Sequence, residues 1–433
     1  MAHVEVSEVS RSSTSKSSLS RRHLLGLAGG GIAALAVSPL GAAPAFSANG
    51  RLVPSAKVGT IAYTQRDVPG RLAVATGQAV KGYLGGADFP DDPTDLGPLV
   101  DLPGGWKELF EFYAKVGINQ VEFAGYGQNP LNPGGSASYP NDGNANGRAA
   151  YLAYARTLRG FLDDNGLEAI GNHGFIPATW DGPGSAGGAM TDADRLRLQT
   201  ELEFAAILGT PFMGTGNDPT SANDRNIEQW TLAGEKWTAL NLIAREWGIQ
   251  MYTHNHSPAY NFLQDGPMVT ITQDRLTGAT IPATQVRAES GKRLMQHYLD
   301  VTDPELVVVE MDIYWAHVAQ HQHRWRYDEN GQRVEDIFDP LATVAKQTQR
   351  YPLFHAKDGD STGAAPGVGN GYEMIPFGDS RSDIDYQGFF KNDGARGFHN
   401  PNYEQDNAPS QTDPGQSLRF TAISARNMNA LRG

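Results

Sequence analysis

The sequence predicts an α/β protein, a (β/α)8 TIM barrel with long inserted loops on the C-terminal face. From residue 58 onward, short apolar runs of strand length alternate with amphipathic stretches of helix length. Eight such runs occur at near-constant spacing, and a last helical pattern closes the chain. This arrangement favours a barrel over an open doubly wound sheet. No glycine-rich dinucleotide fingerprint follows the first run, which weakens the open-sheet alternative further.

The elements follow in order along the chain. We expect strands at residues 58–64, 118–125, 167–172, 210–216, 249–255, 305–312, 351–357 and 398–406. We expect helices at 105–117, 147–166, 193–209, 227–248, 288–299, 339–350 and 417–431, several of which end in glycine just after the last apolar position. Inserted loops fall at 66–104, 126–146, 174–192, 257–287, 313–337 and 359–383. Most of these loops follow strands, so they belong to the face on which barrel active sites are built.

The N-terminus has the pattern of a targeting segment. Arg21 and Arg22 precede a Gly/Ala-rich apolar stretch, and small residues near Ala45 and Ala48 suit a cleavage site. We therefore expect residues 1–48 to be a twin-arginine signal peptide and disordered N-terminus, followed by a single barrel domain over 49–433. The mature protein would be extracellular or periplasmic. Because Pro39 breaks the apolar stretch, we do not expect a stable membrane anchor.

The amino-acid composition of the chain excludes several classes of function. The chain carries 35 Lys and Arg against 48 Asp and Glu, a net charge of −13, which argues against nucleic-acid binding. It has no cysteine, so thiolate metal sites and cysteine nucleophiles are excluded. These features suit an enzyme for a small-molecule substrate, and they leave a homo-oligomer open.

Polar side chains gather where the predicted strands end. They are Glu122 on strand two, His173 after strand three, His254 and His256 on strand five, Glu310 and Asp312 on strand six, His355 and Lys357 on strand seven, and Glu404 and Asp406 on strand eight. Strand residues two apart face the same side, so each pair can point into the barrel together. Nitrogen and oxygen donors without thiolates suit a divalent cation such as Mn²⁺, Mg²⁺, Zn²⁺ or Fe²⁺.

A second histidine pair, His321 and His323, also has the spacing of a metal site. It falls in the polar inserted segment 313–337, so we consider it the weaker candidate. Each strand-end residue taken alone has an ordinary structural interpretation, as a loop cap or a hydrogen-bonded histidine. The metal-site prediction therefore depends on their convergence at one end of the barrel.

The same segments resemble a known superfamily. The matching pieces are IAYTQRD (61–67), QVEFAGY (120–126), GNHG (171–174), MYTHNH (251–256), VEMDIYW (309–315), LFHAKDGD (353–360), GVGNG (367–371) and YEQDNAP (403–409). Together they resemble the xylose isomerase-like TIM barrel superfamily, in its sugar phosphate isomerase/epimerase family, as an exported member.

The resemblance implies a divalent cation held by strands five to eight. Asp312, His355 and Glu404 match the ligands of strands six, seven and eight. Strand five has no glutamate at the expected place, so His254 or His256 would substitute, and we favour His254 because it lies nearer the strand. Asn261-Phe262 stands where a related branch has a Glu-Phe pair, so one carboxylate of that branch is missing.

The activity implied is that of an isomerase or epimerase acting on a sugar or sugar derivative. A base would take a proton next to a carbonyl and leave a metal-bound enediolate. Candidate bases are Glu404, His173 and Glu310, and Lys357 could donate to a substrate oxygen. We expect Glu122, His256, Trp315 and Tyr314 at the substrate, and Phe123 and Tyr126 could extend an aromatic wall.

Three alternatives remain open at this stage. From an oxidised (3-keto) glycoside, the same proton abstraction can proceed to β-elimination, which would make the enzyme a lyase or deglycosylase. A metal-independent glycoside hydrolase would need only two carboxylates at a suitable separation. A sugar-binding protein without catalytic activity would also bind these ligands, because fold resemblance alone does not settle function.

Overall fold

The structure is a computed structural model that describes residues 50–68, 105–126, 145–178, 180–183, 188–361, 373–391, 399–410 and 415–433. All of them belong to one compact unit that begins at Pro44. The expected signal peptide, residues 1–48, lies outside the described residues. The same is true of all or part of the expected loops 66–104, 126–146, 174–192 and 359–383.

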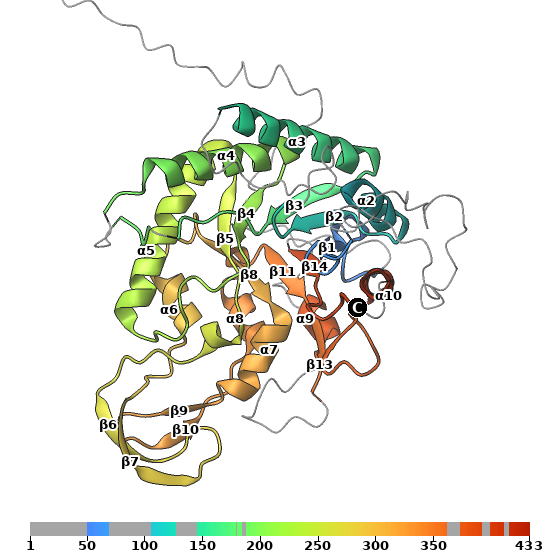
Figure 1. The fold of residues 1–433 in the computed structure, drawn as a ribbon. Coiled ribbons are helices and arrows are strands. Elements are labelled where there is room, and N and C mark those ends of the chain that lie inside the picture. The colour runs from blue at the N-terminus through green and yellow to red at the C-terminus, as the bar shows by residue number, and fades with distance from the viewer. Residues whose placement is uncertain are drawn as a thin grey trace, which may run out of the picture. The chain divides into compact units, whose positions relative to one another are not determined.

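The predicted barrel is present. Its strands are β1 (Gly59–Ile61), β2 (Gln120–Phe123), β3 (Glu168–Asn172), β4 (Phe212–Thr215), β5 (Gln250–Thr253), β8 (Val308–Asp312), β11 (Leu353–Ala356) and β14 (Asn400–Tyr403). They form one parallel sheet in the order β3-β2-β1-β14-β11-β8-β5-β4 (Figure 1). A parallel bridge between His173 and Gly214 joins the two ends of this order. All eight predicted strands are therefore confirmed, and so is the (β/α)8 topology, as a nearly closed barrel.

The predicted helices surround the barrel. They are α2 (Gly105–Lys115), α3 (Ala145–Asp164), α4 (Asp192–Leu208), α5 (Ile227–Ala244), α6 (Leu294–Val301), α8 (Pro340–Lys346) and α10 (Gln416–Ala430) (Figure 1). Their ends follow ordinary capping rules. The Thr191 side chain accepts from the Asp194 amide at the start of α4, and Gly209 ends the same helix with a left-handed φ of 76°. Short 3-10 turns lie at Ser55–Lys57, Arg245–Trp247, Ser257–Tyr260 and Thr348–Arg350.

The segment 313–337 is not a loop as expected. Helix α7 (Ile313–Gln322) begins directly after β8, and the Asp312 carboxylate caps it by accepting from the Trp315 amide at 2.9 Å. The sequence shows no turn between strand and helix, because the last strand residue is itself the helix N-cap. A second short helix, α9 (Tyr386–Lys391), was not predicted either.

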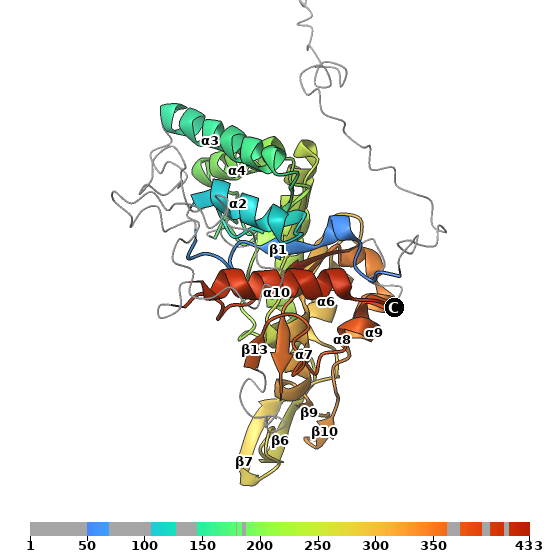
Figure 2. The same cartoon turned by 90° about the vertical axis from the view of Figure 1, so that its right-hand side faces the viewer.

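Hairpins occupy the segments inserted after three barrel strands. They are β6 (Met268–Gln273) with β7 (Thr280–Arg287), β9 (Trp325–Tyr327) with β10 (Arg333–Glu335), and β12 (Asp358–Asp360) with β13 (Glu373–Ile375). The first two lie side by side (Figures 1 and 2). Val269, Ile271 and Tyr327 join them in a small hydrophobic cluster separate from the barrel core. These segments are therefore structured additions rather than open loops.

The barrel interior is layered. Ile170, Tyr252, Val308 and Leu353 form a small buried cluster inside it. Two residues further along β8 and β11 come Glu310 and His355, and two further again come Asp312 and Lys357. Since residues two apart share a face, an apolar floor leads into a polar upper layer. Within the described residues, no helix is long and apolar enough to cross a membrane.

A candidate metal centre at the carboxyl ends of the strands

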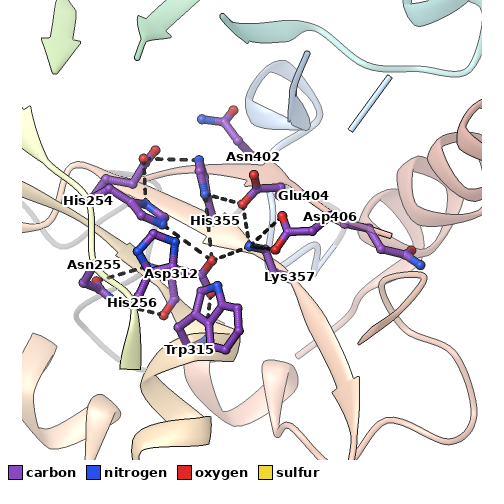
Figure 3. Close-up of polar contacts among 12 residues, drawn as sticks. His254, Asn255, His256, Asp312, Trp315, His355, Lys357, Asn402, Glu404 and Asp406 are labelled. Carbon is purple, nitrogen blue, oxygen red and sulfur yellow. Dashed lines mark hydrogen bonds and ion pairs between the residues drawn. The ribbon is translucent and has the colours of Figure 1, made fainter. Parts of the chain in front are cut away.

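Lys357 lies at the centre of the outermost polar layer, which we call the outer group (Asp312, Lys357, Glu404 and Asp406). Its Nζ lies 2.9 Å from Asp312 Oδ2, 2.8 Å from Glu404 Oε2 and 3.1 Å from Asp406 Oδ1 (Figure 3). Lys357 and Asp312 are both buried. Burial lowers the pKa of Lys357, but the three carboxylates outweigh it and hold that pKa well above its ordinary value. The outer group therefore already stabilises a positive charge.

Two imidazoles stand between this layer and a deeper one. The Nδ1 atom of His355 lies 2.7 Å from Glu404 Oε2, and its Nε2 lies 3.1 Å from Glu310 Oε2. His254 also bridges the two layers, but with its nitrogens exchanged: Nδ1 lies 3.2 Å from Glu310 Oε2 and Nε2 lies 3.8 Å from Asp312 Oδ2. Burial lowers the pKa of His355, yet the surrounding glutamates raise it well above its ordinary value. Burial and the neighbouring His355 hold the pKa of His254 well below its ordinary value.

The deeper layer, the inner group, consists of Glu122, His173 and Glu310. His173 Nε2 lies 3.0 Å from Glu310 Oε2 and 3.3 Å from Glu122 Oε1. Burial lowers the pKa of His173, but hydrogen bonds to the two glutamates raise it to about 9. The Tyr252 hydroxyl and the Asn402 amide both donate to Glu122. Burial and the negative charge of Glu122 raise the pKa of Glu310, so a nearby positive charge would stabilise its ionised form.

His173 also approaches the backbone closely. A Cβ atom on Gly216 would lie 2.5 Å from His173 Nδ1, so a larger residue there would displace the ring. The side chain of His173 is 15% exposed, whereas those of Glu122 and Glu310 are fully buried. Of the inner group, His173 alone therefore reaches the surface of a cavity.

That cavity, the site cavity, has a volume of about 440 Å³. The residues that line it include His173, His254, His256, Lys357, Glu404 and Asp406. Trp315 contacts two of these lining residues, with its ring 5.7 Å from that of His256 and 5.6 Å from Lys357 Nζ. Burial, with Lys357 nearby, lowers the pKa of His256 to about 4, so its imidazole is neutral at pH 7.

The residues fit a divalent cation. Two sets of donor atoms each lie within 4.8 Å of one another: His173, His254, Glu310 and His355 in one, and Asp312, His355 and Glu404 in the other. Five carboxylates lie in these two layers, those of Glu122, Glu310, Asp312, Glu404 and Asp406. Among the described ion pairs of this cluster, Lys357 supplies the one ammonium group. Glu310 Oε1 is buried with no hydrogen-bond partner in the described part of the chain. Oxygen and nitrogen donors with surplus negative charge are what such cations require.

The structure brings nearly all the predicted residues together. His173, His254, His256, Glu310, Asp312, Trp315, His355, Lys357, Glu404 and Glu122 lie in or beside these two layers. Of the four residues expected at the substrate, Glu122 is fully buried under the centre and hydrogen-bonded within it. His256 lines the site cavity, and Trp315 contacts His256 without being one of the lining residues.

Tyr314 does not fit the expectation of a substrate contact. It is 1% exposed and packs in the hydrophobic core. Because neighbouring residues of a helix point about 100° apart, Tyr314 and Trp315 cannot both face the cavity. Phe123, also expected in an aromatic wall, is fully buried in the same core.

The pair His321 and His323 is placed on and just after α7 and belongs to neither donor set. His323 is surrounded by arginines; burial and Arg293 lower its pKa to about 3. The sequence signalled Asp406 only through its spacing from Glu404. It gave no signal for Tyr252 and Asn402, whose contacts with Glu122 come from other strands.

Comparison with known proteins supports the fold. No protein-family description and no curated protein matches the chain. Among solved structures, a sugar phosphate isomerase/epimerase from Parabacteroides distasonis is similar at 16% identity with a TM-score of 0.50, over 91% of this chain and 96% of that one. A second protein of that description from the same organism is 17% identical (TM-score 0.44, over 75% of this chain and 91% of that one). A xylose isomerase domain protein from Planctomyces limnophilus is 13% identical (TM-score 0.41, over 74% and 92%).

The first of these similarities covers almost the whole of both chains. At this level of identity it establishes architecture and leaves the reaction to be argued from the site itself. The eight parallel strands, the helices between them and this similarity agree with one another. The chain therefore has a TIM-barrel fold similar to that of this sugar phosphate isomerase/epimerase, the fold that the resemblance in its sequence implied.

Proposed function

We propose that this protein is a divalent-metal-dependent enzyme that removes a proton next to the carbonyl of a sugar or sugar derivative, in the manner of an isomerase or epimerase. The observation that carries the proposal is that Asp312, His355 and Glu404 place their donor atoms around one point beside the site cavity, where they could bind a cation together. The fold is shared with a protein described as a sugar phosphate isomerase/epimerase, which supports the choice of a sugar as substrate.

We assign the cation to Asp312, His355, Glu404 and His254. Two of these, His254 and Glu404, line the site cavity, and a catalytic cation needs a position open to substrate. When bound there, a divalent cation polarises the carbonyl and so makes the neighbouring C–H bond more acidic. Glu122 and Glu310 would then support His355 and His254 from behind, as groups next to metal-bound imidazoles usually do.

Two cavity residues are suited to opposite proton-transfer roles. Burial raises the pKa of Glu404, but His355 and Lys357 outweigh it and hold that pKa well below its ordinary value, so Glu404 is ionised. The pKa of His173 is about 9, so His173 carries a proton at pH 7. Groups whose pKa values are pushed apart in this way form an acid and base pair. Glu404 would accept the proton and His173 would supply one. Glu310 does not line the site cavity and is better placed to orient His173.

Lys357 would stabilise the substrate oxygen that gains negative charge. Its ammonium lines the site cavity and is held by three carboxylates, so it is charged and fixed in position before substrate arrives. Preorganised donors of this kind are among the largest contributions to catalysis. Removing it should therefore affect turnover more than metal binding.

Elemental analysis of the purified protein, combined with assays before and after chelation, tests the proposal. The substrates would be free aldoses and ketoses together with 3-keto glycosides. We expect about one divalent cation per chain and loss of turnover with chelator, restored by one added metal. Undiminished activity after chelation would instead indicate a two-carboxylate hydrolase. Bound metal with no turnover on any substrate would indicate a sugar-binding protein. Release of an aglycone from a 3-keto glycoside that stops when the metal is chelated would identify the lyase or deglycosylase outcome.

We also propose that the protein is exported by the twin-arginine pathway. Arg21 and Arg22 before the apolar stretch support this, and that pathway carries folded proteins, which suits a chain that acquires its metal first. N-terminal sequencing of secreted protein should give a start within residues 46–49. Secreted protein that still begins at Met1 would contradict the proposal.

A further inference from the structure

Tyr63 is an exposed aromatic side chain in the wall of the site cavity. It follows the last residue of β1 by two positions, so it lies on the face of the barrel that carries the candidate metal centre. Its neighbours Ala62 and Thr64 are buried, whereas Tyr63 is 39% exposed. A single exposed aromatic residue is ordinary on a protein surface. In a cavity of ligand size it has a different meaning, because aromatic rings in such cavities contact what the cavity binds.

The aromatic surface of this cavity comes from Tyr63. No other phenylalanine, tyrosine or tryptophan is among the described residues that line it. The aromatic residues that the sequence placed at the substrate, Phe123, Tyr126, Tyr314 and Trp315, are not among the lining residues. Tyr63 is therefore the residue that can offer an aromatic face to a molecule bound at the candidate metal centre.

The Tyr63 ring is held in place by Arg66. The Arg66 guanidinium lies over the ring, with Cζ 4.1 Å from the ring centroid. Arg66 Nη1 donates to the Tyr63 carbonyl at 2.9 Å, and Nη2 donates to the Asp406 carbonyl at 2.8 Å. The turn itself is anchored to β14, because the Gln405 amide donates to Thr64 Oγ1 at 3.1 Å. One face of the ring is thus covered by a fixed side chain, and the opposite face is left for a ligand.

Asp406 supplies an accessible hydrogen-bond acceptor in the same cavity. Its two carboxylate oxygens lie 3.1 and 3.2 Å from Lys357 Nζ, which is their one partner among the described residues. The Asp406 side chain is 33% exposed, whereas that of Glu404 is 6% exposed and that of Asp312 is fully buried. Asp406 also belongs to neither set of metal donors. Because two carboxylate oxygens offer about four acceptor sites, Asp406 can keep Lys357 and still accept from a ligand.

An aromatic face together with a carboxylate matches the surface of a sugar ring. Such a ring presents C–H bonds on its faces and hydroxyl groups around its edge. The C–H hydrogens carry a small positive charge, and the face of an aromatic ring is negative. The hydroxyl groups donate hydrogen bonds, and those to an ionised acceptor are the stronger kind.

We infer that Tyr63 and Asp406 bind the substrate beside the metal: the Tyr63 ring stacks on a C–H face of a sugar in its ring form, and Asp406 accepts hydrogen bonds from its hydroxyl groups. The substrate contacts that select a sugar are then separate from the residues that hold the cation. This inference deepens the proposed function and rests on it.

Calorimetric titration of the metal-loaded protein tests the inference. The probes are glucose, galactose and xylose, their methyl glycosides, and the 3-keto derivatives of these glycosides. The probe that binds the wild-type protein most tightly is then titrated into each variant. If the metal-loaded wild type binds no probe of this panel, the inference and the proposed function both fail.

Tyr63→Leu keeps an apolar side chain but removes the ring. We expect it to weaken binding of the chosen probe roughly threefold to tenfold, the range of an aromatic contact, whereas Tyr63→Phe should stay within about twofold of wild type. Trp247→Leu is the matched control and should leave the affinity unchanged, because Trp247 is 37% exposed but does not line the site cavity. Normal binding by Tyr63→Leu would overturn the inference while the proposed function stands. An equal loss in Tyr63→Phe would do the same, since the hydroxyl rather than the ring would then make the contact.

Asp406→Asn tests the acceptor. It should weaken binding of the same probe roughly tenfold, because a charged acceptor is replaced by a neutral one. Its metal content should stay near that of wild type, since Asp406 is in neither donor set. Asp164→Asn, at an exposed position of α3, is the control. Unchanged affinity in Asp406→Asn would overturn the part of the inference that concerns this residue.

Discussion

The site cavity shares a wall with a larger cavity of about 750 Å³, the side cavity, and the two differ in how their buried carboxylates are paired. Around the site cavity, each of the five clustered carboxylates contacts an ammonium or an imidazole. In the side cavity, the buried carboxylate of Glu201 instead accepts a hydrogen bond from the Tyr151 hydroxyl at 3.1 Å. The first arrangement balances the negative charges of the carboxylates with nearby cationic groups, as proton transfer at a catalytic site requires. The second pairs a buried carboxylate with a neutral donor, so burial raises the pKa of Glu201.

The largest expected effect is the loss of a ligand in the outer group. Asp312→Asn should strip most of the metal and lower turnover on the order of 10³-fold, because the centre loses a charged donor. Asparagine is also a good N-cap, so α7 should still begin at the same place. Metal content by elemental analysis and turnover are the measurements.

Glu310→Gln is the companion variant, since Glu310 belongs to the other donor set. It should retain at least half of the metal. If Glu310→Gln loses the metal while Asp312→Asn keeps it, the cation belongs to His173, His254, Glu310 and His355 instead.

Lys357→Met should separate catalysis from metal binding. We expect turnover to fall about 10²- to 10³-fold, because a fixed donor is lost, while metal content stays at or above the wild-type level. The metal-free variant should also melt at a lower temperature, since Asp312 and Glu404 lose their cationic partner. Lys346→Met, at an exposed lysine of α8, is the control. Normal kinetics in Lys357→Met would remove this residue from the mechanism.

Glu122→Gln tests the support from the inner group. Glu122 contacts both His173 and His355 and lies under them, out of reach of substrate. We expect a loss of 10- to 100-fold in metal affinity or turnover, the range typical of groups that orient metal-bound histidines. An unchanged metal dissociation constant together with unchanged turnover would show that the buried carboxylate has no positioning role.

The smallest effect concerns the side cavity and is a matter of stability. Burial raises the pKa of Glu201 from 4.5 to about 7, although Tyr151 and Arg197 act in the opposite direction. The folded protein therefore binds this proton more tightly than the unfolded chain does. The resulting stability is fully present below about pH 4.5 and is lost as the pH rises through 7.

Glu201→Gln should flatten this dependence and raise the unfolding free energy at pH 8 by roughly 1–3 kcal/mol relative to wild type. Denaturant unfolding between pH 4.5 and 8 measures it, with Glu235→Gln at an exposed position of α5 as the control. Parallel profiles for wild type and Glu201→Gln would show that Glu201 is compensated after all, and the contrast between the cavities would weaken.

The sequence could predict the barrel and most of the centre because both follow from periodicity. Residues two apart in a strand share a face, and parallel strands end at one edge. His355 and Lys357 on one strand were therefore expected to face Glu310 and Asp312 on the neighbouring strand. The structure shows these contacts, His355 with Glu310 and Lys357 with Asp312. The order of the layers was not predictable, because it depends on the strand stagger, and neither were the contacts of Tyr252 and Asn402 with Glu122.

The side cavity could not be predicted in the same way. Tyr126, Asn172, Glu201 and Lys236 come from four separate segments, and no spacing links them. Helix α7 was not predicted because its N-cap is the last residue of a strand. The hairpins after β5 and β8 were not predicted because they have few apolar positions. Features assembled by tertiary packing leave no periodic trace in the chain.

The two carboxylate oxygens of Asp312 have different partners. One accepts from the Trp315 amide at the start of α7, and the other faces Lys357. Loading or emptying the centre is therefore transmitted to the first turn of a helix that carries the Trp315 ring. The exchange rate of that one amide proton with heavy water should thus act as a gauge of occupancy, readable without any knowledge of the natural substrate.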